Sequence, residues 1–213
     1  MTEPQAATIP RKLPRQARAA ATMEAILEGA AHILRRDGLG GFTTNHIAER
    51  AGVSIGSLYQ YFPGKEAILA ELIRRKRAAL LGAFQTIAAD EALDLPQAID
   101  RLVAVGIDRQ LADPVLSLAL DYAEAALPLQ AETRSLKVAL IGTVAGLLAR
   151  HGIADPAVAA RDLIALARGM ADLEGLYGEA DGPSLGRRIR RAVFGYLGPG
   201  PFSSTPLPSG SLK

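Results

Sequence analysis

The stretch TTNHIAERAGVSIGSLYQYF, residues 43–62, decides how the first third of the chain folds. Thr43 or Thr44 can cap a short helix that carries apolar residues on one face, and Gly52 ends it. Ser54 can then cap a second short helix. Two helices that meet at a large angle within three or four residues need a backbone position that glycine adopts cheaply, and Gly52 supplies it. The stretch therefore predicts a helix-turn-helix unit, whose second helix can enter the major groove of duplex DNA.

Apolar residues keep helical spacing on both sides of this unit. A helix is predicted before it, over residues 15–36, with Gly38 suited to the left-handed position beyond its end. A long helix is predicted after it, from Lys65 to about Ala89. Prolines, glycines and capping residues then divide the chain into further predicted helices at 95–111, 115–127, 130–150, 156–178 and 183–197. Because no convincing alternation of apolar and polar residues predicts a strand, we expect an all-α fold with about nine helices.

Composition narrows the classes of function. Residues 1–80 hold 12 Lys and Arg against 7 Asp and Glu, whereas residues 81–213 hold 12 against 15. A basic first third suggests a polyanionic partner for that part, although ordinary surface charge explains it equally well. The chain has no Cys, which excludes disulfides and thiolate metal sites and suits the cytoplasm. No apolar run reaches the roughly 18–20 residues that span a bilayer, and we expect no membrane partner or signal peptide.

Lys65 stands where a cation opposes the helix dipole, at the start of the long predicted helix. A DNA phosphate at that place would interact favourably with both the free backbone N–H groups and the ammonium group. The alternative is that Lys65 is simply exposed, at negligible cost. Thr43 and Thr44 have a similar double interpretation, since one can cap the helix while the other binds phosphate.

Residues 15–75 resemble the DNA-binding domain of the tetracycline-repressor (TetR) family of bacterial transcription factors. The features that match are a first helix ending at Asp37-Gly38, then TT..IA..AGVS.GSLY.YF, then Lys65-Glu66. The family often has a better-capping residue at the position of Gly64, but glycine caps nearly as well. The resemblance implies an all-helical homodimer in which the second helix of the unit reads the major groove. It also implies that the C-terminal helices bind a small effector and the partner subunit.

The resemblance places the DNA contacts on three parts of the unit: the start of its supporting helix, its reading helix and the next helix start. These predicted DNA-binding residues are Thr44, Asn45, Ser54, Ile55, Gly56, Ser57, Tyr59, Gln60, Tyr61 and Lys65. Since Ile55 and Gly56 offer no side-chain hydrogen bonds, base reading should rely on thymine methyl contacts, a few polar groups and DNA shape. A basic arm can reach a minor groove or remain solvated, and its residues are Arg11, Lys12, Arg15 and Arg18.

We divide the chain into a flexible basic arm (1–14), a DNA-binding domain (15–64), an effector-binding and dimerisation domain (65–198) and a disordered, Pro-, Gly- and Ser-rich tail (199–213). Dimers gain specificity by binding two half-sites, so we assign the last two helices to a dimerising four-helix arrangement. The predicted interface residues are Leu163, Leu166, Met170, Leu173, Ile189, Val193 and Tyr196, although some must fill the monomer core. Tyr122, Thr143 and Met170 are predicted to line an effector pocket, with ordinary packing as the alternative.

The sequence thus predicts a repressor that binds a palindromic operator and is released by a small hydrophobic effector. One alternative is a helical interaction module, which would show no affinity for duplex DNA at low salt. Another is a hydrolase, because residues 52–56 match the G-x-S-x-G pattern. That motif requires a preceding strand, and none is predicted. We therefore expect no enzyme activity and no cofactor, and the three His residues lack metal-ligand spacing.

Overall fold

The structure of the chain is a computed structural model, and it describes residues 17–177 and 182–198. Within these ranges the chain is all α, as expected, and contains no strand. The nine helices of this part are α1 (Ala17–Asp37), α2 (Thr44–Ala51), α3 (Ile55–Tyr61), α4 (Lys65–Ala89), α5 (Leu95–Leu111), α6 (Pro114–Ala126), α7 (Gln130–Arg150), α8 (Pro156–Tyr177) and α9 (Gly182–Leu197). The predicted arm, residues 1–14, and the predicted tail, residues 199–213, lie outside the described residues.

Side-chain caps set several of the helix starts. Asp94 and Gln97 form a reciprocal capping box at the start of α5, where the Asp94 carboxylate accepts from the Gln97 backbone N–H at 2.8 Å. Asp113 accepts from the Leu116 N–H at the start of α6, and Pro114 occupies the first turn. These local signals are visible in the sequence, which is why the predicted and observed helix bounds agree closely.

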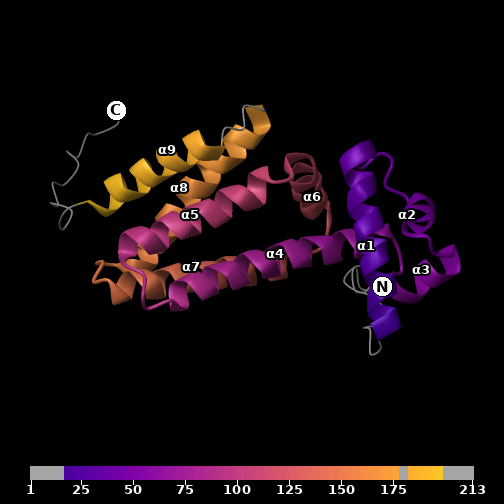
Figure 1. Ribbon diagram of the computed structural model, residues 1–213, viewed down its shortest axis with the longest axis horizontal. Coiled ribbons are helices and arrows are strands. Elements are labelled where there is room, and N and C mark those ends of the chain that lie inside the picture. The colour runs from indigo at the N-terminus through magenta and orange to yellow at the C-terminus, as the bar shows by residue number, and fades with distance from the viewer. Residues whose placement is uncertain (1–16, 178–181, 199–213) are drawn as a thin grey trace, which may run out of the picture.

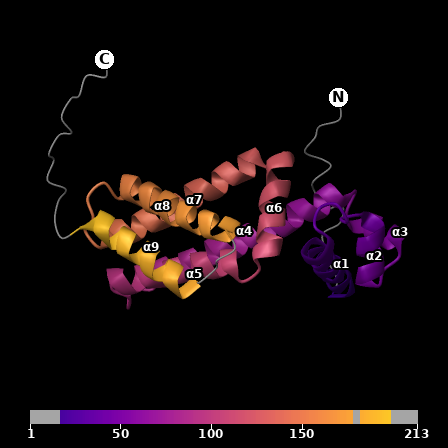
Figure 2. The ribbon, with the colours of Figure 1, turned by 90° about the horizontal axis from the view of Figure 1, so that it is seen from above.

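Two hydrophobic clusters build the molecule, and α4 runs from one to the other (Figure 1). The first cluster holds the buried side chains of α1, α2 and α3, together with α4 residues from Ala67 to Ile73. It also includes Leu120, Ala123 and Leu127 from α6 and its end, so it crosses the predicted boundary between residues 64 and 65. The second cluster joins the far end of α4 to α5, α7, α8 and α9. Figure 2 shows α2 and α3 at one end of the molecule and α9 at the other. Among the described residues, no helix is both long and apolar enough to cross a membrane.

Candidate nucleic-acid interface

The connection between α2 and α3 is a tight turn at Gly52. Its backbone is left-handed, with φ 67° and ψ 29°, and its N–H donates to carbonyl groups at the end of α2. The next residue, Val53, donates its N–H to Ala48 O at 3.0 Å. A Cβ at Gly52 would meet no atom within 4 Å, so glycine is favoured here by backbone conformation and not by lack of space. The predicted helix-turn-helix geometry is confirmed at this turn.

The supporting helix α2 is held close to α1. A Cβ added to Gly29 of α1 would lie 3.2 Å from Ala51 N and 3.3 Å from Ile47 O, tighter than ordinary contact. At its start, Thr43 caps α2 by accepting from the His46 N–H at 3.3 Å. The neighbouring Thr44 is left to bond elsewhere. Thr43 therefore takes the capping role, whereas Thr44 faces α3 and its binding to phosphate stays a prediction.

The outward face of α3 is formed by residues that the core does not bury. Ile55 is 39 % exposed and Tyr59 is 41 % exposed, although both are large. Gln60 on α3 and Asn45 on α2 are exposed beside them. The hydroxyl groups of Tyr59 and Thr44 lie 3.2 Å apart, which joins this face to the start of α2. Large exposed side chains are typical of a binding surface when the opposite side of their helix is packed in the core, as it is for α3.

Apart from Ile55, the first turn of α3 and its cap carry only short side chains. Ser54 caps the helix by accepting from the Ser57 N–H at 3.0 Å, and the two serine hydroxyls lie 2.8 Å apart. Between them, Gly56 is exposed, and a Cβ there would meet only Ser54 Oγ, at 3.9 Å. Packing therefore does not require a glycine at this position. Because Gly56 and Ser57 have little side-chain volume, a groove wall or base edge can approach the backbone of this turn closely.

Tyr61 lies elsewhere than the sequence predicted. It is only 8 % exposed and belongs to the first hydrophobic cluster, next to the fully buried Phe62. Its ring is therefore a core residue beneath the exposed face of α3. The physical reason is its helical position, three residues after the buried Leu58 and hence on the same side of the helix.

Lys65 is exposed at the first position of α4, as the sequence suggested. Gly64 precedes it with extended backbone and makes no side-chain capping bond. The N–H groups of the first turn are thus not satisfied by a side-chain cap, and they lie beside both the Lys65 cation and the Glu66 carboxylate. The uncapped N–H groups and the Lys65 ammonium would favour a phosphate at the start of α4 if the Glu66 side chain turned away from it.

The G-x-S-x-G match does not form a nucleophile elbow. Ser54 stands between two helices, and its hydroxyl caps α3 instead of rising from a strand end. A hydrolase of that kind needs a strand before the serine, but here α2 precedes it. Nothing at Ser54 is arranged for nucleophilic catalysis.

Three of the predicted dimer-interface residues are core residues of the monomer. Leu163, Ile189 and Val193 are 4 %, 1 % and 3 % exposed, so they cannot contact a partner. The apolar residues along one side of α9 are buried within the second cluster, so they are not available to a partner. Tyr196 is partly buried and donates its hydroxyl proton to Asp162 at 2.8 Å, which raises the pKa of Tyr196.

Besides Tyr196, three predicted interface residues keep some exposed surface. Leu166 and Met170 are partly buried against the second cluster, whereas Leu173 is 56 % exposed on α8. Leu173 is thus the best placed of the predicted residues to contact a partner.

The three predicted effector residues are not brought together. Tyr122 is 63 % exposed on α6, so its ring lines no interior pocket. Thr143 is half-buried and donates its hydroxyl to Ala139 O of its own helix, and Met170 packs against the second cluster. The prediction for Tyr122 is wrong because the buried stripe of α6 consists of Ser117, Leu120 and Ala123, which leaves Tyr122 outside.

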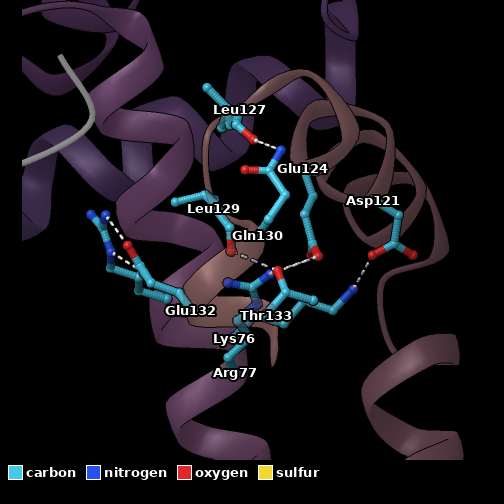
Figure 3. Close-up of polar contacts among 10 residues, drawn as sticks. Lys76, Arg77, Asp121, Glu124, Leu127, Leu129, Gln130, Glu132 and Thr133 are labelled. Carbon is cyan, nitrogen blue, oxygen red and sulfur yellow. Dashed lines mark hydrogen bonds and ion pairs between the residues drawn. The ribbon is translucent and has the colours of Figure 1, made fainter. Parts of the chain in front are cut away.

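A polar network between α4, α6 and α7 was not visible in the sequence (Figure 3). Arg74 donates two bonds to the Glu132 carboxylate, at 2.7 and 2.8 Å, and this pairing lowers the pKa of Glu132. Arg77 lies 2.6 Å from Glu124, and its Nη1 is buried without a hydrogen-bond partner among the described residues. These pairs join residues far apart in the chain, so only the folded structure reveals them. They attach the middle of α4 to α6 and α7.

Comparisons with known proteins match both parts of the chain. Residues 26–72 match the family model described as bacterial regulatory proteins, tetR family. Residues 94–197 match the model described as the tetracyclin repressor-like C-terminal domain. No curated protein matches the sequence.

Solved structures share the fold at low sequence identity. A protein from Mesorhizobium loti, described as a TetR-family transcriptional regulator, has 20 % identity, a TM-score of 0.67 and coverage of 85 % of this chain and 98 % of its own. A TetR transcriptional regulator from Legionella pneumophila has 18 % identity, a TM-score of 0.64 and coverage of 85 % and 97 %. A SmeT–triclosan complex has 22 % identity, a TM-score of 0.63 and coverage of 88 % and 99 %.

Proposed function

Because the chain belongs to the tetR family of bacterial regulatory proteins, we propose that it is a dimeric repressor that binds a palindromic operator and releases it when a small effector binds. One observation carries the proposal: α3 lies at one end of the molecule and presents an exposed face of Ile55, Tyr59 and Gln60 (Figure 2). The short residues Gly56 and Ser57 stand beside this face in the first turn. A helix held in this way by a tight turn fits the major groove.

The proposed DNA contacts fall into two kinds. Thr44, Asn45, Tyr59 and Lys65 supply hydroxyl, amide and ammonium groups for phosphates, which position the protein without reading sequence. Ile55, Gly56, Ser57 and Gln60 face the base edges, with Ile55 against thymine methyl groups and Gln60 suited to adenine. The proposed specificity is modest for a single subunit, which is why two subunits are needed.

The proposed dimer uses the outer face of α8. Leu173 is the most exposed of the predicted interface residues, and Gly169 is exposed on the same helix, four residues earlier. A small residue there lets a partner helix approach closely. Two copies related by a twofold axis would set their α3 helices against half-sites about 34–36 Å apart, or a multiple of that spacing.

The proposed effector acts through α4. This helix begins with Lys65 beside the reading unit, is attached at its middle to α6 and α7 by the polar pairs of Figure 3, and ends in the second cluster. An effector that favours a different position of α4 would change the separation of the two α3 helices by a population shift. Binding of triclosan by the similar SmeT protein supports a hydrophobic small molecule as the effector class.

The proposed function is tested by selecting bound duplexes from a random pool and measuring affinity for the selected duplex by fluorescence anisotropy. We expect a palindromic consensus, and binding that weakens steeply as salt rises. A scrambled duplex of the same length is the control. If no duplex binds above the scrambled level at low salt, the chain is a helical interaction module instead.

A further inference from the structure

Helix α9 carries four arginines within five residues, Arg187-Arg188-Ile189-Arg190-Arg191. Two of the four have partners: Arg188 pairs with Glu174 of α8 at 2.5 Å, and Arg190 donates to Asp100 of α5 at 2.5 Å. Arg187 and Arg191 are exposed and make no ion pair or hydrogen bond with any described residue. They stand four residues apart on one side of the helix, where like charges repel.

These arginines border a hollow between α9 and the start of α5. The hollow has a volume of about 540 Å³ and is lined by Pro96, Arg187, Arg190, Arg191 and Phe194. The Arg190 guanidinium lies over the Phe194 ring, 5.0 Å from its centre, so one wall combines an aromatic face with a fixed cation. The first turn of α5 contributes Pro96 to the lining, and the positive end of its dipole is already capped by the Asp94 carboxylate.

We propose that this hollow binds an amphipathic organic anion, that is, a carboxylate joined to an aromatic or aliphatic body. The carboxylate lies between Arg187 and Arg191, whose planar guanidinium groups suit two-point hydrogen bonding and whose mutual repulsion it relieves. The body packs against Phe194 and Pro96. Arg190 stays with Asp100 and orients the ring, so two positive charges remain for the ligand.

The position of the hollow separates it from the other proposed sites. Helices α5 and α9 lie side by side at the end of the molecule away from α2 and α3 (Figure 1 and Figure 2), so a bound DNA half-site does not cover it. None of Tyr122, Thr143 and Met170 lines it. The aromatic wall favours an organic anion over an inorganic one, because a bare phosphate gains nothing from Phe194.

The test is isothermal titration calorimetry of the full chain with 1-naphthoate as the probe and 1-naphthalenemethanol as its neutral counterpart. We expect saturable binding of the naphthoate and none of the alcohol. Arg187→Gln combined with Arg191→Gln should weaken naphthoate binding by more than about tenfold, because about tenfold is the loss expected from one exposed charge-assisted contact and this variant removes two. The matched control is Arg134→Gln with Lys137→Gln, which removes two exposed charges from α7 and should leave binding unchanged.

Several results would overturn the proposal. Equal binding of naphthoate to the wild type and to the Arg187/Arg191 variant would show that these arginines do not bind the ligand. Equal binding of the alcohol would show that the site does not require a negative charge. Displacement of naphthoate by sulfate at equal concentration would reduce the site to a patch for simple anions. A changed monomer–dimer equilibrium in that variant, with unchanged naphthoate binding, would assign the arginines to a second copy of the chain. None of these outcomes depends on whether the protein binds DNA.

Discussion

The phenolic oxygen of Tyr59 lies 3.2 Å from the hydroxyl oxygen of Thr44, so the exposed face of α3 and the start of α2 share a hydrogen bond. Between them the two hydroxyl groups have two protons, and the shared bond uses one. The other remains available to a phosphate oxygen. The pair therefore forms one polar unit that spans both helices of the proposed DNA-binding surface.

Replacing Tyr59 by Phe should weaken operator binding while hardly changing the fold. The bond is exposed, so its loss should cost less than about 1 kcal/mol of unfolding free energy. Operator affinity should fall roughly five- to tenfold, the value of one polar contact to phosphate. Thr44→Val should act similarly, and the double variant should lose less than the sum, since the hydroxyls act together. Anisotropy with the selected duplex measures this, with Tyr122→Phe as the distant control; strictly additive losses would contradict the shared unit.

Gly56→Ala should separate stability from DNA binding. A Cβ there meets only Ser54 Oγ at 3.9 Å, so the folded chain accepts it. Alanine also favours the helix by up to about 1 kcal/mol, and urea unfolding should show a gain within that range. If the first turn of α3 approaches base edges, the added methyl group should weaken binding about tenfold. The control is Gly82→Ala on α4, also exposed and without neighbours within 4 Å, which should gain stability and keep its affinity. Unchanged binding by Gly56→Ala would place DNA elsewhere.

Lys65→Ala should lower operator affinity for every sequence and reduce the salt slope, d log K against d log [salt], by about 0.9, the value of one lost phosphate contact. Stability should stay level or rise by a few tenths of a kcal/mol, because an unfavourable cation leaves the start of α4. Lys137→Ala, which removes an exposed charge from α7, should leave the slope unchanged. If Lys65→Ala leaves the salt slope unchanged, Lys65 does not contact a DNA phosphate.

The helix ends were predictable because their causes are local. Gly52 and the caps at Ser54 and Asp94 act within three or four residues, so the sequence alone displays them. The side of a helix that becomes buried is harder to predict where two apolar partners compete. Ile189 and Val193 have the spacing of an interface stripe, but the same stripe also fits the monomer core, and there it packs.

The contacts between distant residues could not be predicted. Arg74 and Glu132 are 58 residues apart, and nothing near either residue indicates the other. The arginine run 187–191 is a charge pattern that was not singled out from the sequence, because its role depends on Phe194 and on Pro96, which only the packing of α9 against α5 places beside it. The predicted contact residues of α3 other than Tyr61 are at least partly exposed, because a single short helix presents them together, and their contact with DNA stays a prediction.

The pair Arg74–Glu132 should give the stability of the protein a pH dependence at the acidic side. The guanidinium holds the pKa of Glu132 below its ordinary value, so Glu132 stabilises the fold above the unfolded pKa of about 4.3 and loses that effect as pH falls through the folded pKa. Glu132 keeps 37 % of its side-chain exposure, so solvent screening limits the contribution to about 1 kcal/mol or less. Glu132→Gln should be less stable than the wild type at pH 7 and equal to it near pH 3, in urea titrations at both pH values. A difference that persists at pH 3 would assign the effect to packing.

Leu173→Glu should convert a dimer into monomers if α8 forms the partner contact. Leu173 is 56 % exposed, so a carboxylate there is solvated in the monomer and should change its unfolding free energy by no more than about 0.5 kcal/mol. In the dimer the same carboxylate would be buried near its symmetry copy, at a cost of several kcal/mol. Sedimentation velocity should show the monomer, and operator affinity should fall because a monomer reads one half-site. Val138→Glu is the matched control, since Val138 is 66 % exposed on α7 and outside the proposed interface. If Val138→Glu gave monomers and Leu173→Glu stayed dimeric, α7 and not α8 would hold the contact, and the proposed separation of the α3 helices would be wrong with it.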